Sequence, residues 1–173
     1  MLTEPHWFQG RDSYLQEIRQ AVSIPIIRKD FVVDEYMIYE AKLMGADAVL
    51  LICAILNDQE LKRFFQIADS LGLTALVEAH DQEEVDRALK AGARLIGVNN
   101  RDLHTFTVDI NNSIRYRQSV PENVLFVSES GIRTKDDIRR LMDNNVNGVL
   151  IGETMMRAQD RVAAVREFIG YSR

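Results

Sequence analysis

The feature that most limits how this chain can fold is a repeated pattern. In it, a short apolar run is followed by a polar loop, an amphipathic helical segment and a glycine. The apolar runs are nearly continuous in Val, Ile and Leu, which is typical of strands buried on both faces of a parallel sheet. Because strands that alternate with helices pair in parallel, the pattern predicts an α/β fold. Strands are predicted at Pro25–Phe31, Ala48–Ala54, Thr74–His80, Leu95–Asn100, Val124–Ser130 and Gly148–Glu153.

The helical segments carry start and stop signals. Asn57 can cap a helix with Glu60 three residues later, and Gly72 can end that helix. The same capping pattern is predicted at Asp34, Asp81 and Thr134. Two further helices are predicted near the ends of the sequence, at 12–21 and 160–170. No linker or low-complexity segment divides the 173 residues, so 1–173 is predicted to form a single domain.

Two architectures fit this alternation, a closed (β/α) barrel and an open doubly wound sheet. Polar residues stand at or near the C-terminal ends of several different predicted strands, namely Lys29, Glu78, Asn99, Glu129 with Ser130, and Gly152 with Glu153. An open sheet gathers its site at one switch point, whereas a barrel brings every strand end to one rim. The distribution therefore predicts a TIM (β/α)8-type barrel.

Composition excludes several classes of partner and compartment. The net charge of −5 argues against nucleic acid, because phosphate backbones attract basic surfaces. The only cysteine, Cys53, lies in the apolar run AVLLICA, which indicates a buried structural thiol, and one cysteine permits no intrachain disulfide. No apolar run has the length of a membrane span, and MLTEPHWFQG does not resemble a signal peptide. We therefore expect a cytoplasmic protein without nucleic-acid or membrane partners.

Lys29 and Glu78 are candidates for proton transfer. A lysine inside an apolar strand is costly unless its ammonium reaches a polar cavity or a partner. Strand alternation sends Arg28 and Asp30 to one side and Lys29 to the other, where it can act as an acid. An equally good interpretation is a structural ion pair between Lys29 and Glu78, which stands at the same level of its own strand.

Further polar residues suit a phosphorylated sugar. Asn99 can bind sugar hydroxyls and Arg101 a carboxylate or phosphate, although Asn100 and Asp102 suit the capping of a turn. The glycines that follow the last two predicted strands allow the backbone to approach a phosphate closely. His80 is predicted to be a loop residue with a surface hydrogen bond. The spacing of His6, His80 and His104 suggests no metal site.

These motifs, in this order, resemble the indole-3-glycerol-phosphate synthase family over essentially the whole chain. The matching segments are LTE, FQG, IPIIRKDFVVDEYMIYEA, GADAVLLI, LVEAHD, IGVNNRDL, VSESGI and LIGE. The resemblance implies a lyase of tryptophan biosynthesis that acts on 1-(2-carboxyphenylamino)-1-deoxyribulose 5-phosphate. The family closes the pyrrole ring of the product with loss of carbon dioxide and water, without a metal or an organic cofactor.

The resemblance also implies a role for each matching position. Lys29 resembles the general acid, Glu78 the carboxylate that transfers protons during dehydration, and Asn99 the residue that holds sugar hydroxyls. Arg101 and Glu129 would orient the region where the ring closes. The remaining positions resemble substrate contacts at Phe8, Phe31, Ser130 and Leu150 and phosphate contacts at Gly131, Gly152 and the backbone of Glu153.

The chain departs from the family pattern at its beginning. MLTE matches only the end of the family's second strand, so the sequence predicts an incomplete barrel without the first strand and the glutamate, lysine and serine that it carries. The alternatives are a fragment that needs this strand from a partner, or another phosphate-sugar barrel such as a phosphoribosyl isomerase. The latter leaves RKDF and GVNNRDL unexplained. Open barrel edges would also favour self-association.

Overall fold

A computed structural model describes residues 1–102 and 105–170. Contacts between residues divide the chain into two compact units. Unit 1 comprises Met1–Glu78 and Asp86–Leu95, and unit 2 comprises Ala79–Val85 and Ile96–Arg173. The prediction of a single domain stays a prediction. No helix within the described ranges is both long and apolar enough to cross a membrane.

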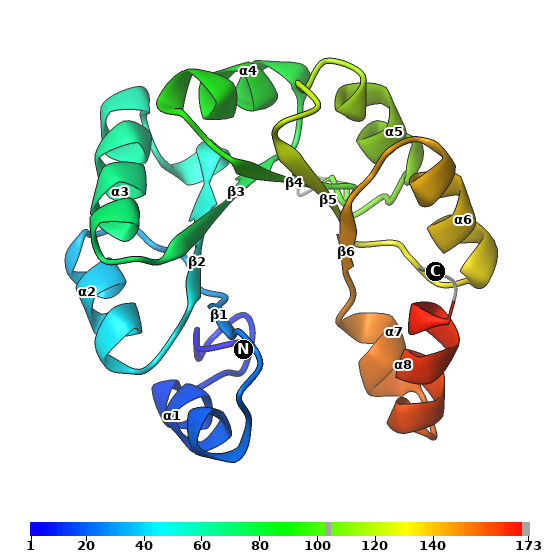
Figure 1. Cartoon of the computed structure of the whole chain (residues 1–173), viewed down its shortest axis with the longest axis horizontal. Coiled ribbons are helices and arrows are strands. Elements are labelled where there is room, and N and C mark those ends of the chain that lie inside the picture. Colours follow the sequence, from blue (N-terminus) through cyan, green and yellow to red (C-terminus); the bar gives the residue numbers. More distant parts are fainter. Residues whose placement is uncertain (103–104, 171–173) are drawn as a thin grey trace. The chain divides into compact units, whose positions relative to one another are not determined.

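Unit 1 is built from parallel strands and helices in alternation (Figure 1). Strand β1 pairs with β2, which pairs with β3, so the order in space follows the order in the chain. Helices α2 and α3 pack against β2 and against each other. The elements are α1 (Asp12–Ala21), β1 (Ile27–Arg28), α2 (Tyr36–Leu43), β2 (Ala48–Ile52), the short 3₁₀ helix η1 (Cys53–Ile55), α3 (Asp58–Ser70) and β3 (Thr74–Ala79).

Helix α3 shows how local sequence sets an element. The Asn57 side chain accepts hydrogen bonds from the backbone N–H groups of Gln59 and Glu60, and the Glu60 carboxylate accepts the N–H of Asn57. This is the predicted capping box, and Gly72 at the other end adopts the expected positive φ of 66°. The apolar face of α3 is buried, with Leu61 fully inaccessible to solvent. The start and end of this helix are therefore confirmed.

Arg28 ties three elements of unit 1 together. Its side chain is only 3% exposed and forms ion pairs with Asp12 of α1, Asp30 and Glu40 of α2, the last at 2.8 Å. Asp30 also accepts a hydrogen bond of 2.6 Å from the Thr3 hydroxyl. Arg28 and Asp30 thus lie on one side of the chain, as the alternation predicts, and the network holds the strand end from which Lys29 projects.

Unit 2 repeats the alternation. Strands β5 and β6 are parallel, with Glu129 paired to Leu150, and α5 packs against β5. Its strands are β5 (Leu125–Glu129), β6 (Gly148–Leu150) and β4 (Leu95–Asn99), whose first residue belongs to unit 1. Its helices are α5 (Asn111–Arg117), α6 (Lys135–Asp143), α7 (Glu153–Arg157) and α8 (Arg161–Ile169), and α4 (Gln82–Ala91) has residues in both units. Within each unit the strands follow chain order, which is typical of (β/α) barrels rather than doubly wound sheets.

Several predicted boundaries are wrong. The strand expected at Pro25–Phe31 is reduced to β1, with Lys29 in a single parallel bridge to Leu2. The strand expected at Gly148–Glu153 ends at Leu150, because Gly152 caps α7. Helix α2 begins two residues after Asp34, whose carboxylate still accepts the N–H of Tyr36. Helices α5 and α7 were not predicted, since neither segment has an apolar stripe of helical period.

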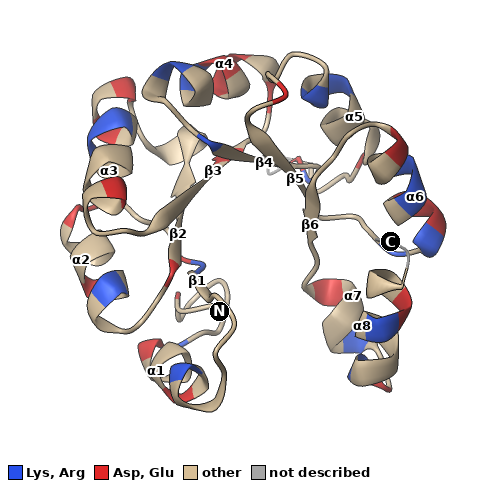
Figure 2. Ribbon diagram, viewed as in Figure 1, with Lys and Arg blue, Asp and Glu red and all other residues tan. Residues whose placement is uncertain are grey.

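Charged residues lie mainly on the helices, and few lie in the strands (Figure 2). The exceptions include two glutamates near strand ends. Glu78 in β3 and Glu129 in β5 are 3% and 1% exposed. Both are predicted site residues, and both lie near the C-terminal end of their strand.

Candidate functional site

In unit 1, Lys29 contacts an aromatic pair. Its ammonium lies 4.5 Å from the centroid of the Phe8 ring, and Phe8 stacks on Phe31 with the ring centroids 5.0 Å apart. All three side chains are half-buried. The described residues include no ion pair between Lys29 and Glu78, so the alternative of a structural Lys29–Glu78 pair finds no support. A lysine over an aromatic face keeps its charge partly compensated and its N–H groups available to a ligand.

The carboxylate of Glu4 holds the loop that carries Phe8. It accepts the backbone N–H groups of His6, Trp7 and Phe8, and the Glu4 carbonyl accepts the N–H of Gly10. Burial raises the pKa of Glu4, but the hydrogen bonds from His6, Phe8 and Trp7 outweigh it and leave the pKa below its ordinary value. Glu4 therefore stays ionised at neutral pH and positions Phe8 over Lys29.

Glu78 and His80 stand at the end of β3. Glu78 is paired in register with Ile52 of β2 and is almost completely buried. His80, which belongs to unit 2, is half-buried, and its Nδ1 lies 3.1 Å from the Glu84 carboxylate. The prediction of a hydrogen-bonded loop histidine is confirmed for His80, but the bond is not at the surface, because the two side chains are only 16% and 14% exposed.

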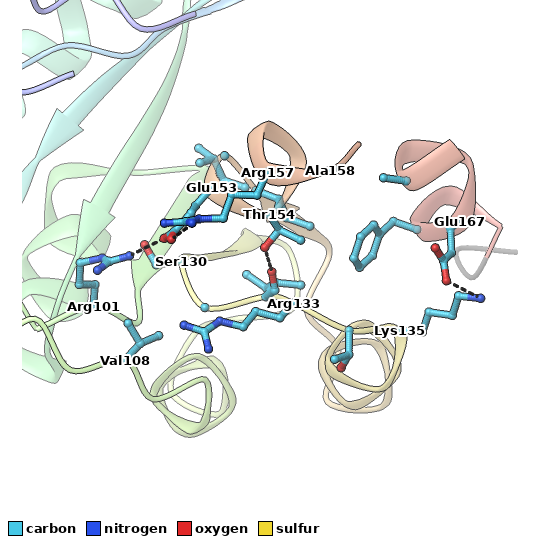
Figure 3. Close-up of a pocket in the computed structure, with 18 residues that line it drawn as sticks. Arg101, Val108, Ser130, Arg133, Lys135, Glu153, Thr154, Arg157, Ala158 and Glu167 are labelled. Atoms are coloured by element: carbon cyan, nitrogen blue, oxygen red, sulfur yellow. Dashed lines mark hydrogen bonds and ion pairs between the residues drawn. The ribbon is translucent and has the colours of Figure 1, made fainter. Parts of the chain in front are cut away.

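Unit 2 contains a cavity of about 710 Å³, large enough for a phosphorylated metabolite. Figure 3 shows Arg101, Ser130 and Glu153 at one end of it and Lys135 with Glu167 at the other. Four basic and two acidic side chains line the cavity, which therefore favours an anion. The lining includes six predicted site residues, Arg101, Ser130, Gly131, Leu150, Gly152 and Glu153.

A tight turn follows β5 at the cavity wall. Ser130 and Gly131 have positive φ values of 65° and 80°. A Cβ added to Gly131 would lie 2.3 Å from Cγ1 of Val108, whereas one added to Gly152 would have no heavy atom within 4 Å. Gly131 is therefore required by the backbone and by Val108, whereas a side chain at Gly152 would have open space around it.

The two asparagines at the end of β4, Asn99 and Asn100, play different parts. The Oδ1 atom of Asn99 accepts the N–H of Arg101 at 3.1 Å, so Asn99 itself caps the turn. The capping expected of Asp102 is confirmed by its hydrogen bond from the N–H of Thr105. Asn100 points instead into the protein and bonds to Ser128 and Ser130.

Arg101 belongs to a chain of ion pairs at the cavity. Its Nη2 atom lies 3.4 Å from Glu153, and Glu153 also lies 3.0 Å from Nε of Arg157. All three side chains are at least partly exposed, so these pairs are weak and can exchange with a bound anion. Arg133 and Arg157 also line the cavity, and no sequence pattern predicts them, because charged residues in loops and short helices give no periodic signal.

Three further predictions concern a metal site, His104 and Cys53. No group of three or more His, Cys, Asp or Glu side chains in the described part of the chain could hold a metal ion. His104 lies outside the described residues. Cys53 is buried, as expected of a structural thiol.

The fold resembles that of 3-hexulose-6-phosphate synthase from Salmonella typhimurium. The TM-score is 0.83 at 14% identity, and the match covers 98% of this chain and 85% of that protein. At this identity the likeness concerns the fold alone, and it supports the predicted α/β class of incomplete barrel type.

Comparison of the sequence with known proteins gives a consistent family. The chain is 56% identical over 170 residues to an indole-3-glycerol phosphate synthase from Ruminiclostridium cellulolyticum and 54% identical over 166 residues to one from Lachnoclostridium phytofermentans. These matches cover 98% and 96% of this chain but only 65% and 61% of the relatives. The family model for indole-3-glycerol phosphate synthase matches residues 1–168, and the chain belongs to that family.

Proposed function

We propose that this chain carries the indole-3-glycerol-phosphate synthase reaction, the ring closure of 1-(2-carboxyphenylamino)-1-deoxyribulose 5-phosphate with loss of carbon dioxide and water. The observation that carries the proposal is the family match over 1–168 in a chain whose unit 2 has a cavity lined by four basic and two acidic side chains. The cavity lining includes the residues expected to contact phosphate, namely Gly131, Gly152 and Glu153, and also Arg101, which is expected to contact the substrate. A phosphorylated small molecule is accordingly the proposed ligand, and the cytoplasm the proposed location.

Unit 1 supplies the proposed acid. As the aromatic carbon of the substrate attacks the ketone carbon, Lys29 donates a proton to the ketone oxygen. Its contact with Phe8 orients the ammonium, and the Phe8–Phe31 stack offers an apolar surface to the substrate's aromatic ring. Glu78, buried at the end of β3, is proposed to accept a proton during the later dehydration.

Unit 2 supplies the proposed contacts to the sugar and phosphate. Asn99 would bind sugar hydroxyls, and Arg101 and Glu129 would orient the region of ring closure. Leu150 would form an apolar wall. The phosphate would lie against the backbone of Ser130 and Gly131, with Gly152 and the N–H of Glu153 on the other side.

Lys29→Met tests the catalytic proposal, because it removes the proton donor and keeps most of the stem volume. General acid catalysis contributes about 10²–10⁴-fold in rate, so turnover should fall by that factor. The assay follows indole-3-glycerol phosphate formation, first with the chain alone and then with a fragment that carries the part of its relatives outside this chain. Near-normal turnover by Lys29→Met in an active sample would refute the assignment.

Gly152→Val tests the phosphate site. The open space around a Cβ at this position predicts that the fold survives while the valine projects toward the anion. Calorimetric titration with inorganic phosphate should therefore show weaker binding with an unchanged melting temperature. Equal affinity in the two proteins would place the phosphate elsewhere.

A second proposal is self-association, which the exposed apolar residues of unit 2 support. Val162, Val165 and Ile169 follow one another at helical spacing on α8, and all three are exposed, as is Val149 of β6. Contiguous apolar surface of this kind favours burial against another chain. Sizing chromatography with light scattering should give a mass above that of a monomer, and Val165→Glu should reduce it. A monomeric wild-type protein at micromolar concentration would exclude this proposal.

A further inference from the structure

Asn100 is the centre of a buried polar network in unit 2. The residue is 1% exposed. Its Nδ2 atom donates to the Ser128 hydroxyl at 2.9 Å and to the Ser130 carbonyl at 3.1 Å, and its Oδ1 accepts the Ser113 N–H at 3.1 Å and the Ser113 hydroxyl at 2.8 Å. The hydroxyls of Ser113 and Ser128 lie 2.8 Å apart. Both amide hydrogens and both lone pairs of Asn100 are therefore used, which fixes the orientation of its amide.

The backbone of Asn100 adds two further connections. Its N–H donates to the Glu129 carbonyl at 2.9 Å, and its carbonyl accepts the N–H of Asp109 at 3.0 Å. Through one residue, the end of β4 is joined to β5, to helix α5 by way of Ser113, and to the loop that returns at Asp109. No side-chain polar atom of Asn100 is left for a ligand, so the residue acts through the groups that it holds.

Within this network, the turn at Ser130 has the least favourable backbone conformation. A residue other than glycine in the left-handed region costs about 1–2 kcal/mol, and here Ser130 has a φ of 65°. The bond from Asn100 to the Ser130 carbonyl stabilises this conformation directly. Such strain at a cavity wall is typical of a binding site, since it sets where the neighbouring N–H groups point.

We propose that Asn100 is a positioning residue that holds the Ser130–Gly131 turn in the conformation that binds the anion. Its effect on catalysis rests on the proposed function, because the substrate phosphate is the proposed ligand of this turn. Its effect on the turn itself does not depend on that function. Without the Asn100 amide, the Ser130 backbone should relax toward negative φ and rotate the N–H of Gly131.

The test is a set of variants titrated with inorganic phosphate in the full chain. Asn100→Ala should weaken binding roughly tenfold, a factor equal to about 1.4 kcal/mol, which is the size of one hydrogen bond. The double variant Asn100→Ala/Ser130→Gly is compared with Ser130→Gly alone. The difference in phosphate affinity between these two proteins should be much smaller than tenfold, because glycine adopts positive φ without the hydrogen bond from Asn100. Ser113→Ala is the matched control: it removes the hydroxyl bond to the same amide but leaves the bond from Asn100 to the Ser130 carbonyl.

The outcomes separate this proposal from the proposed function. Equal losses of affinity in Asn100→Ala and Ser113→Ala, or no recovery on adding Ser130→Gly, would show a general structural role and overturn the proposal. If the wild-type chain binds no phosphate, the proposed anion site is wrong. Amide hydrogen exchange then tests whether Asn100 holds the Ser130–Gly131 turn. Faster exchange confined to residues 130–132 in Asn100→Ala then supports positioning, and unchanged exchange there refutes it. Should Asn100→Ala not fold, Asn100→Ser takes its place in every arm.

Discussion

The same substitution at two glycines of one cavity should have very different consequences for stability. Gly131 and Gly152 both line the cavity of unit 2, but only Gly131 has a positive φ and a side chain in the path of an added Cβ. Gly152 has a negative φ of −108° and open space around it. We therefore expect Gly131→Ala to destabilise the protein and Gly152→Ala to leave its stability nearly unchanged.

The magnitude follows from two contributions at Gly131. Placing alanine at a φ of 80° costs about 1–2 kcal/mol. The approach of 2.3 Å to Cγ1 of Val108 must be relieved by movement, and overpacking of this kind costs roughly 1–3 kcal/mol. The sum is about 2–5 kcal/mol, which corresponds to a fall in melting temperature of roughly 5–15 °C for a chain of this length. Gly152→Ala should stay within about 0.5 kcal/mol of the wild type.

Thermal unfolding followed by circular dichroism measures both variants. A third protein, Gly131→Ala/Val108→Ala, lacks the obstructing methyl group and is compared with Val108→Ala alone. The difference in stability between these two proteins should no longer contain the steric contribution. Only the backbone cost of about 1–2 kcal/mol should then remain. Equal melting temperatures for Gly131→Ala and Gly152→Ala would refute the reasoning, and a double variant without recovery would refute the role of Val108.

Three further predictions concern unit 1. Asn57→Ala should cost about 1 kcal/mol through loss of the capping box, measured by urea unfolding, and no change in stability would show that the α3 cap is dispensable. Arg28→Met should cost roughly 3–5 kcal/mol because it leaves the buried Asp30 carboxylate without its cation, and a melting temperature equal to that of the wild type would contradict this. Because the folded-state pKa of Glu4 lies below its ordinary value, its stabilisation of the loop is complete above that ordinary value and is lost as the pH falls through the lowered pKa. Fluorescence emission from Trp7, the single tryptophan, should show this loss as a transition below pH 4.5. The measurement uses a His6→Gln background so that the neighbouring histidine does not contribute, and Glu4→Gln should abolish the transition.

The sequence predicts those features that depend on neighbours in the chain. The caps at Asn57 and Thr134 follow from polar residues three positions apart, and both capping boxes are present. The opposite placement of Lys29 and Arg28 follows from the alternation of a strand, even though β1 itself is short. The unit 2 residues expected near phosphate line one cavity because all of them follow strand ends.

What could not be predicted depends on contacts between distant segments. Asn100 and Asn99 are chemically identical in the sequence, and only the positions of Ser113 and Ser128 decide which one is buried. Helix α5 lacks an apolar face because its buried residues are Ser113 and Arg117, which pack through hydrogen bonds. Pattern analysis relies on apolar periodicity and cannot detect a helix of this kind.

The pairing of each strand with the next one in the chain has a consequence for how the protein folds. Ile27 pairs with Ala48 and Ala48 with Thr74, and in unit 2 Val127 pairs with Gly148. Each pairing closes a loop of only one helix and its connections, so the entropy cost of every closure is small and nearly equal. Structure can then grow by one strand and one helix at a time, in the order in which a ribosome releases them. We expect nascent chains that end after β3 to resist proteolysis already over α2 and α3.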